Sequence, residues 1–320
     1  MTVTPALSVV MSVYNGVRSL RDTMDSVLSQ EGVDLEFIVV NDGSTDATGE
    51  ILAEYASRDG RINVLSQENQ GLTCALIAGC AQARGKYIAR QDCGDVSLPG
   101  RFARQRDILD AKPAVLLVSC ATRVVGPSDE ELYTVVQLSE ELEEGLRQLT
   151  VQKVRGPSHH ASTMFRRPAY EQVGGYRAAF PVAQDLDLWM RVSELGRCFA
   201  MPEVLYQAKL APNSISATRR HEQIRAAHSI LACAAARRAG KSEAEHLTRW
   251  QSELAELRAR VGSCRRRSSH SEHARFYYFI ACILRRNRPD RSRFYYWKSI
   301  GSWVLYAPAW VGLARLMMSR

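Results

Sequence analysis

The chain has 320 residues, of which 46% are hydrophobic and 24% are charged. This composition excludes a disordered chain, a collagen-like repeat and a bundle of membrane-spanning helices. The net charge of +8 is uneven, because residues 219–320 hold 21 Lys and Arg against 7 Asp and Glu, a net +14, which leaves −6 for residues 1–218. We therefore predict one large domain over 1–218 and a basic extension over 219–320. Such an extension suits nucleic acid or an anionic membrane surface.

The eight cysteines form no CxxC pair and lie mostly among apolar neighbours. We interpret them as reduced core residues of a cytoplasmic protein. The first ten residues, MTVTPALSVV, lack a charged start and a long apolar core, so we expect no signal peptide.

Strand-like and helix-like patterns alternate over residues 1–120. Apolar runs predict strands over residues 7–14, 35–40, 62–65, 87–90 and 115–120, with amphipathic helices between them. Repeated βα units predict an α/β fold with a Rossmann-like, doubly wound and mainly parallel sheet. Residues 121–218 are less regular, with their clearest helix at 185–195, and the chain after residue 219 reads as helical throughout.

Polar residues follow three of the predicted strands, and ligands of parallel sheets bind at that edge. Asn15 follows the first strand, and Asp42 follows the second. Asp42 either accepts hydrogen bonds from a bound ribose or base, or it forms a turn, which the glycine after it favours. Asp92 and Asp95 follow the fourth strand. In one interpretation they bind Mg²⁺ or Mn²⁺, and the cation in turn binds a diphosphate. In the other they are acids near the N-terminus of a helix, where the helix dipole favours negative charge.

The segment QDLDLWMR places Asp185 and Asp187 at the start of an amphipathic helix. Acids there stabilise a helix, and the alternative is a general base. The sequence has no GxGxxG after the first strand, no GxxxxGK[ST], no HExxH, no CxxC zinc pattern and no GxSxG. It therefore lacks the usual marks of dinucleotide-binding proteins, P-loop proteins, zinc enzymes and serine hydrolases.

The ordered segments LSVVMSVYNG, FIVVNDGSTDAT, NQGL, GKYIARQDCGD with SLPGR, GGYR and QDLDLWMR closely resemble the family 2 glycosyltransferases with the GT-A fold. The resemblance covers residues 6–216, and it is the order of the segments that makes it specific. It implies an inverting enzyme that moves a sugar from a nucleotide-sugar donor to a hydroxyl of a glycan or lipid-linked acceptor. Surface polysaccharide biosynthesis is the pathway that the resemblance suggests.

The resemblance assigns four residues to the donor. Tyr14 and Asn15 match the end of the family's first strand, where the aromatic ring lies near the nucleotide base. Asp42 matches the acid that hydrogen-bonds the base. Asp92 matches the first Asp of the family's DXD motif.

Four more residues lie in the segments that would bind the acceptor or contain the catalytic base. His160 matches the histidine before the family's Met-Phe-Arg run, and we place it on the acceptor side. Asp185 matches the catalytic base. We interpret Asp187 as a structural acid that caps the helix. Trp189 is either a core residue or the floor of an acceptor site.

Three positions depart from the family pattern. Gly94 stands where the second Asp of DXD usually binds the metal, so either Asp95 takes Mn²⁺ or Mg²⁺ through a shifted loop, or metal binding is weaker. Gln184 replaces the Glu before the base, and Ile77 stands where Asn is frequent. These departures leave open a catalytically weak homologue that binds nucleotide-sugar or glycan without turnover.

The basic extension ends in residues 294–320. Sixteen uncharged residues separate Lys298 from Arg315, which is short of the roughly 20 needed to span a bilayer, and Pro308 interrupts them. The segment is either an interfacial helix on an anionic leaflet or a helix packed on the protein with a solvated basic face. We predict peripheral attachment to the inner face of the plasma membrane. Nucleic acid is not expected as a partner, because the body is acidic and no nucleic-acid module is recognisable.

Overall fold

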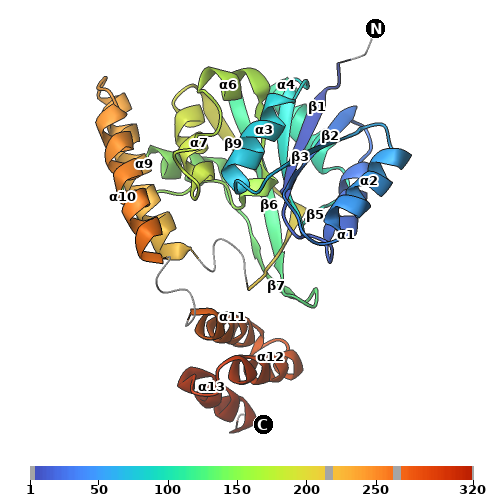
Figure 1. The fold of residues 1–320 in the computed structure, drawn as a ribbon, viewed down its shortest axis with the longest axis vertical. Coiled ribbons are helices and arrows are strands. Elements are labelled where there is room, and N and C mark those ends of the chain that lie inside the picture. The colour runs from blue at the N-terminus through green and yellow to red at the C-terminus, as the bar shows by residue number, and fades with distance from the viewer. Residues whose placement is uncertain (1–3, 213–218, 262–267, 319–320) are drawn as a thin grey trace. The chain divides into compact units, whose positions relative to one another are not determined.

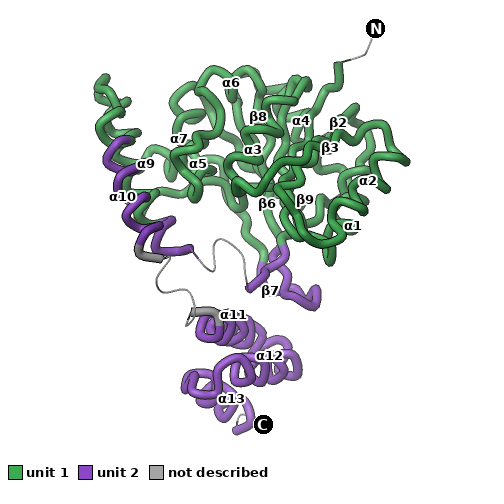
Figure 2. Tube along the Cα trace, viewed as in Figure 1, with its two compact units in different colours: residues 1–123, 134–208, 224–247 green, residues 124–133, 209–223, 248–320 purple. Residues whose placement is uncertain are grey.

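The chain folds into two compact units in a computed structural model that describes residues 4–212, 219–261 and 268–318. The first unit holds residues 1–123, 134–208 and 224–247, and the second holds residues 124–133, 209–223 and 248–320 (Figure 2). Each unit combines separate stretches of the chain. The boundary that we predict between residues 218 and 219 stays a prediction.

The first half of the chain alternates strands and helices (Figure 1). Its elements are β1 (Leu7–Val13), α1 (Leu20–Leu28), β2 (Leu35–Asp42), α2 (Thr48–Arg58), β3 (Ile62–Gln67), α3 (Leu72–Ala81) and β4 (Tyr87–Asp92). The strands lie in the order β3-β2-β1-β4 and are all parallel. Strands β1 and β2 are buried on both faces of the pleat, which is why they read as continuous apolar runs.

The next elements complete the sheet. They are β5 (Val96–Ser97), α4 (Arg101–Ala111), β6 (Val115–Val125), β7 (Glu131–Val135), α5 (Ser139–Arg147), the short 3₁₀ helix η1 (His160–Ser162), β8 (Met164–Arg166), α6 (Arg167–Gln172), α7 (Gln184–Ser193) and β9 (Arg197–Lys209). Strand β8 lies between β4 and β6 and is antiparallel to both, so β6 runs in the direction of β4. With three residues, β8 is too short to show a strand period in the sequence.

The carboxyl ends of β1, β2 and β4 lie side by side at one edge of the sheet. Ser12 is paired with Asp92, and Val13 is paired with Asn41. Strands β2 and β4 extend two residues further than predicted, so Asp42 and Asp92 are the last residues of their strands. The predicted α/β fold with a doubly wound, mainly parallel sheet is confirmed, and this edge is where ligands of such sheets generally bind.

The chain after residue 219 is helical, as predicted. Its helices are α9 (Arg220–Arg238), α10 (Ala244–Val261), α11 (Ser268–Leu284), α12 (Pro289–Ser302) and α13 (Ala307–Met318). Helices α11, α12 and α13 share an apolar core within the second unit. Ser292 and Ser299 of α12 donate hydrogen bonds of 2.7 Å to the carbonyls of Ala281 and Ala274 in α11.

Residues 294–320 do not form the single helix that we predict, and the interfacial role of this segment stays a prediction. The chain leaves α12 after Ser302 and starts α13 at Ala307. Pro308 lies in the first turn of α13, where a missing backbone N–H costs nothing because no carbonyl precedes it in the helix. Among the described residues, no helix is long and apolar enough to cross a membrane.

The described cysteines differ in their burial. The cysteines in the described ranges are all free thiols, and Cys264 lies outside those ranges. Cys80, Cys120 and Cys198 are buried, and burial raises the pKa of the Cys80 thiol to about 11. Cys282 is exposed, so the prediction that every cysteine belongs to a core is wrong at that position.

Candidate active site

The loops after β1 and β2 are tied together at the carboxyl edge of the sheet. Asn15 adopts a left-handed conformation with φ of 53°, which Asn tolerates better than most residues. Its Oδ1 accepts a hydrogen bond of 2.8 Å from the N–H of Thr45, and its own N–H donates to Ser44 Oγ over 3.0 Å. Tyr14 beside it is 53% exposed. Both residues lie where a nucleotide base is predicted, and that role stays a prediction.

Asp42 is buried at the end of β2 and closes the loop that leads into α3. Its Oδ1 accepts hydrogen bonds from Gln67 Nε2 at 2.7 Å and from the N–H of Gln70 at 2.9 Å. Its Oδ2 accepts one from the N–H of Gly71 at 2.9 Å. A carboxylate offers about four acceptor positions, so a further donor from a ligand fits this geometry. Asp42 thus forms the turn, and its predicted contact with a base stays a prediction.

A buried arginine holds Asp92 at the end of β4. Arg90 is fully buried and donates to Asp92 Oδ1 over 2.7 Å and also to the carbonyl of Val10. Burial alone would raise the pKa of Asp92, but the positive charge of Arg90 opposes that effect, and the pKa is lowered overall. Asp92 is therefore an anion, and Arg90 binds only one of its two carboxylate oxygens.

The loop after Asp92 brings Asp95 back toward it. Gly94 has φ of +101°, a conformation that side-chain-bearing residues rarely adopt, and its N–H donates to Thr23 Oγ1 over 2.9 Å. The hydroxyl of Tyr206, in β9, accepts from the N–H of Asp92 at 3.3 Å and donates to Asp95 Oδ2 at 2.9 Å. In this loop it is residue 95, rather than residue 94, that carries the second carboxylate.

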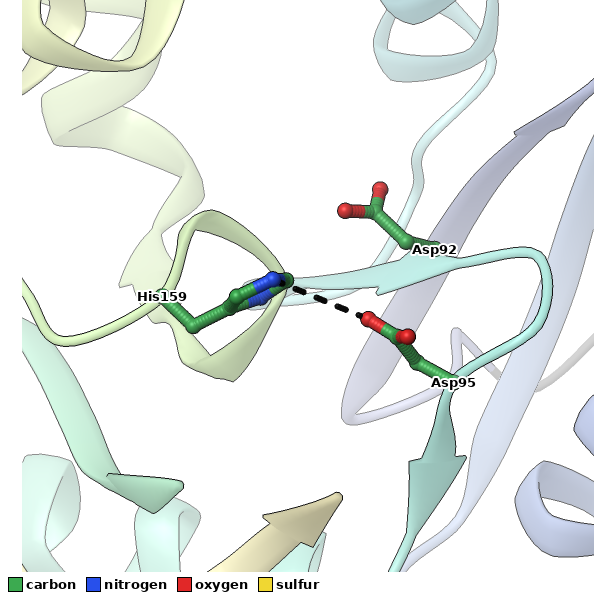
Figure 3. Close-up of side chains that lie close together, drawn as sticks. All are labelled: Asp92, Asp95 and His159. Atoms are coloured by element: carbon green, nitrogen blue, oxygen red, sulfur yellow. Dashed lines mark ion pairs between the residues drawn. The ribbon is translucent and has the colours of Figure 1, made fainter. Parts of the chain in front are cut away.

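Asp92, Asp95 and His159 form a cluster at this edge (Figure 3). One potential ligand atom from each lies within 4.8 Å of the others. His159 Nε2 is 3.8 Å from Asp95 Oδ2, and its ring stacks on Tyr206 with centroids 5.4 Å apart. Two carboxylate oxygens and an imidazole nitrogen are a donor set that divalent cations such as Mn²⁺ accept. The chemistry of the cluster therefore fits the predicted metal.

Asp185 lies in the first turn of α7, half-buried, beside this cluster. Its Oδ1 accepts a hydrogen bond of 2.8 Å from the N–H of Leu186. Burial raises its pKa, and the negative charge of Asp92 adds to the rise, whereas the Leu186 hydrogen bond and His159 oppose it. A carboxylate with a raised pKa is a stronger base, so the position and the basicity of Asp185 suit proton abstraction.

Asp187 has a structural role, but it does not cap the helix as predicted. Asp187 is buried in the first turn of α7, and the N-cap position of this helix is occupied by Ala183. Arg177 binds both of its oxygens, with Nε 3.0 Å from Oδ2, and Arg191 Nη2 lies 2.5 Å from Oδ2. Two guanidinium groups thus neutralise one buried carboxylate, and Arg177 continues to Glu243 at the start of α10.

The two predicted acceptor-side residues lie together in a buried aromatic group. His160 Nε2 is 2.7 Å from the hydroxyl of Tyr176, and its ring meets Trp189 edge to face at 6.0 Å. Burial lowers the pKa of His160 to about 3, so it is neutral. Trp189 is buried, and its indole N–H has no hydrogen-bond partner among the described residues. An acceptor role for either residue stays a prediction.

The sequence did not single out three residues that organise the site: Arg90, His159 and Tyr206. Arg90 is the last residue of the strand predicted over 87–90, and its charge after an apolar run is the only signal that it gives. His159 is hidden by its neighbour, the family-matched His160. Gln184, the departure before the base, is buried at the start of α7, and Ile77 lies in α3.

The comparisons with known proteins decide the family. The family model described as Glycosyl transferase family 2 matches residues 8–174, more than half of the chain. The chain belongs to glycosyl transferase family 2. The sequence resemblance is thereby confirmed, and Asp42, Asp92 and His160 all lie within the matched range.

Curated relatives and solved structures agree with this family. One relative is EpsE of Bacillus subtilis strain 168, which is named as a glycosyltransferase. It is 31% identical to this chain over 210 residues, and the alignment covers 64% of this chain and 73% of EpsE. An uncharacterised glycosyltransferase of Haemophilus influenzae is 28% identical over 238 residues, 71% of this chain and 72% of the relative. The structure of S. aureus TarS 1–349 with UDP has a TM-score of 0.55 at 15% identity, over 98% of this chain and 90% of that one. At this identity, the likeness to TarS shows the fold alone.

Proposed function

We propose that this family 2 glycosyltransferase moves a sugar from a nucleoside-diphosphate sugar to an acceptor hydroxyl with inversion at the anomeric carbon. The observation that supports this most is the convergence of Asp92, Asp95 and His159 within 4.8 Å, with Asp185 beside them. A cation-binding cluster next to a basic carboxylate is what a displacement of a diphosphate needs. TarS, which shares the fold, was solved with UDP, and this favours a nucleoside diphosphate as the donor's carrier.

Each donor group has a defined place in the proposal. Tyr14 and Asn15 lie against the base at the end of β1, and Asp42 accepts a hydrogen bond from it. Asp92, Asp95 and His159 would hold Mn²⁺ or Mg²⁺, which supplies positive charge to the leaving diphosphate when bound. The nitrogen ligand favours Mn²⁺ over Mg²⁺, because Mg²⁺ prefers oxygen ligands.

Asp185 is the proposed base. It removes the proton of the acceptor hydroxyl while the acceptor oxygen forms a bond to the anomeric carbon. The bond between that carbon and the diphosphate oxygen breaks, and the diphosphate leaves with the bonding electron pair. Because entry and departure occur on opposite faces of the carbon, the single displacement inverts its configuration. Asp187 takes no part, since two arginines neutralise it.

The proposed acceptor is a glycan or a lipid-linked glycan of a surface polysaccharide. The name EpsE belongs to a relative, and it supports the reaction class rather than a particular acceptor. His160 and Trp189, whose rings meet edge to face, are the proposed acceptor-side residues. We propose that the reaction takes place in the cytoplasm, at the inner face of the plasma membrane.

Calorimetric titration of UDP, GDP and dTDP against the full chain, with and without Mn²⁺, tests the proposal. We expect one nucleotide to bind at least tenfold more tightly with Mn²⁺. An Asp95→Asn variant should lose that enhancement and keep the metal-independent binding. Asp25, an exposed acid of α1 outside the cluster, provides the matched control, Asp25→Asn, which should behave as the wild type. No binding of any nucleotide would favour an inactive homologue instead.

A further inference from the structure

Helix α13 is apolar on the face that it buries and also on the face that it exposes. Its buried face consists of Ala309, Gly312, Leu313 and Leu316, which belong to the core of the second unit or pack closely on it. The opposite face carries Trp310, Val311, Met317 and Met318, all exposed, and Met318 is 83% exposed. Arg315, at the margin of this face, is the only charged side chain described in the helix. A helix with apolar groups all round is expected to have apolar surroundings on both sides.

The exposed apolar surface continues beyond α13. Trp310 donates from Nε1 to the carbonyl of Val304 over 2.7 Å, which folds the preceding loop against the first turn of the helix. In that loop Leu305 is 76% exposed. Trp297 of α12, also exposed, meets Trp310 edge to face with centroids 5.9 Å apart. We call the surface formed by Trp297, Val304, Leu305, Trp310, Val311 and Met318 the outer patch.

The segment that carries the outer patch also carries an excess of positive charge. Residues 268–318 contain eight Lys and Arg against two Asp and Glu. Arg285 and Arg286 are exposed at the end of α11. The ammonium group of Lys298, next to Trp297, lies 4.7 Å from the ring centre of Phe294. Helices α11 to α13 and their connecting turns therefore combine exposed tryptophans, exposed aliphatic side chains and cations.

We propose that the outer patch docks the protein on an anionic lipid surface. Aliphatic side chains gain free energy by entering the acyl boundary, and tryptophans favour the headgroup level. The cations of the same helices and turns are attracted to anionic headgroups, and this charge complementarity favours an anionic lipid surface over a neutral apolar partner. A nucleic acid would use the cations but would leave Val304, Leu305 and Met318 exposed to water.

This inference deepens the membrane attachment in the proposed function, by naming the side chains that would make it. Its test measures lipid binding alone. Failure of lipid binding therefore leaves the nucleotide titration unaffected, and failure of nucleotide binding leaves the docking surface intact.

The test is sedimentation of the full chain with vesicles of phosphatidylcholine, with and without phosphatidylglycerol. The triple variant Val304→Ser, Leu305→Ser, Val311→Ser removes the centre of the outer patch without touching the buried face of α13. The matched control, Val136→Ser, Leu138→Ser, Leu195→Ser, removes three exposed apolar side chains from the first unit. Thermal unfolding of each variant verifies that the fold is retained.

We expect the wild type and the control to bind phosphatidylglycerol vesicles, and to bind neutral vesicles at least tenfold more weakly. The triple variant should bind anionic vesicles at least tenfold more weakly than the wild type. Arg285→Gln with Arg286→Gln should weaken binding by about fivefold per charge at low salt. Equal binding by the triple variant and the wild type overturns the proposal. Self-association through the patch without lipid binding overturns it as well, and identifies a contact between copies.

Discussion

Tyr206 joins the two carboxylates of the candidate metal cluster through a single hydroxyl. It donates to Asp95 Oδ2 over 2.9 Å and accepts from the backbone N–H of Asp92 over 3.3 Å. The face of its ring is covered by His159 at 5.4 Å and by the guanidinium of Arg101 at 4.6 Å. One buried side chain of β9 therefore orients all three members of the cluster, and such supporting contacts tune metal affinity.

Tyr206→Phe is expected to lower Mn²⁺ affinity by about tenfold, because Asp95 loses the donor that fixes its carboxylate. The ring remains, so the stability loss should be only about 1–2 kcal/mol. Titration of Mn²⁺ in the presence of the bound nucleotide measures the first quantity, and denaturant unfolding measures the second. Tyr133→Phe is the matched control, because Tyr133 is exposed in β7. Unchanged Mn²⁺ affinity in Tyr206→Phe would contradict the supporting role.

The fold could be predicted from the sequence because its signals are local. The buried parallel strands read as apolar runs, and Asp42 and Asp92 stand at their ends. The role of Tyr206 could not be predicted, because its partner Asp95 lies 111 residues away in the chain. No local pattern distinguishes that tyrosine from any other aromatic residue on a strand.

The adjacent histidines show a second limit of sequence reasoning. The family pattern points to His160, but the metal cluster contains His159. His159 has an extended backbone, with φ of −152° and ψ of 141°, and successive side chains of an extended segment point to opposite sides. His159 thus faces Asp95, whereas His160 faces Tyr176. Which histidine faces the carboxylates depends on the register of this segment, and the sequence does not contain that information.

Gly94→Asp, which restores the usual family residue, is expected to destabilise the protein by about 1–3 kcal/mol without raising Mn²⁺ affinity. The cost comes from the backbone, whose φ of +101° is unfavourable for any side chain. Space is not limiting, because an added Cβ would lie 3.4 Å from Ser19 Oγ. Gly94→Ala should lose the same stability, since it carries the same strain without a carboxylate. Tighter Mn²⁺ binding with full stability in Gly94→Asp would show that the loop can adopt the usual conformation.

Asp187→Asn is expected to lower stability by about 3–5 kcal/mol, because it leaves the guanidinium groups of Arg177 and Arg191 without their shared anion. Nucleotide binding by the fraction that remains folded should be unchanged. Glu171→Gln serves as the control, because Glu171 makes an exposed pair with Arg167 worth at most about 0.5 kcal/mol. Denaturant unfolding of both variants distinguishes the two cases. A small effect of Asp187→Asn would mean that the two arginines find other partners.

Asp185→Asn is expected to reduce transfer by about 10²- to 10⁴-fold while nucleotide affinity stays within about twofold of the wild type, because a base acts on the acceptor. Single-turnover assays measure the transfer, and calorimetry measures the affinity. In the wild type, the rate should rise with pH through a pKa above the ordinary value of 3.8, because burial disfavours the charged carboxylate. A loss of nucleotide affinity equal to the loss of rate would show that Asp185 binds the donor.

The same substitution is expected to stabilise the fold at pH 7. Burial raises the pKa of Asp185 in the folded protein above 3.8, so the folded state holds this proton more tightly than the unfolded state does. The contribution of Asp185 to stability is then fully present below pH 3.8 and is lost as the pH rises through the folded-state pKa. The uncharged amide avoids that loss, so Asp185→Asn should unfold at a higher temperature than the wild type at pH 7. The difference should disappear on titration to pH 3, and a variant less stable than the wild type at pH 7 would show that the Asp185 charge is compensated in the fold.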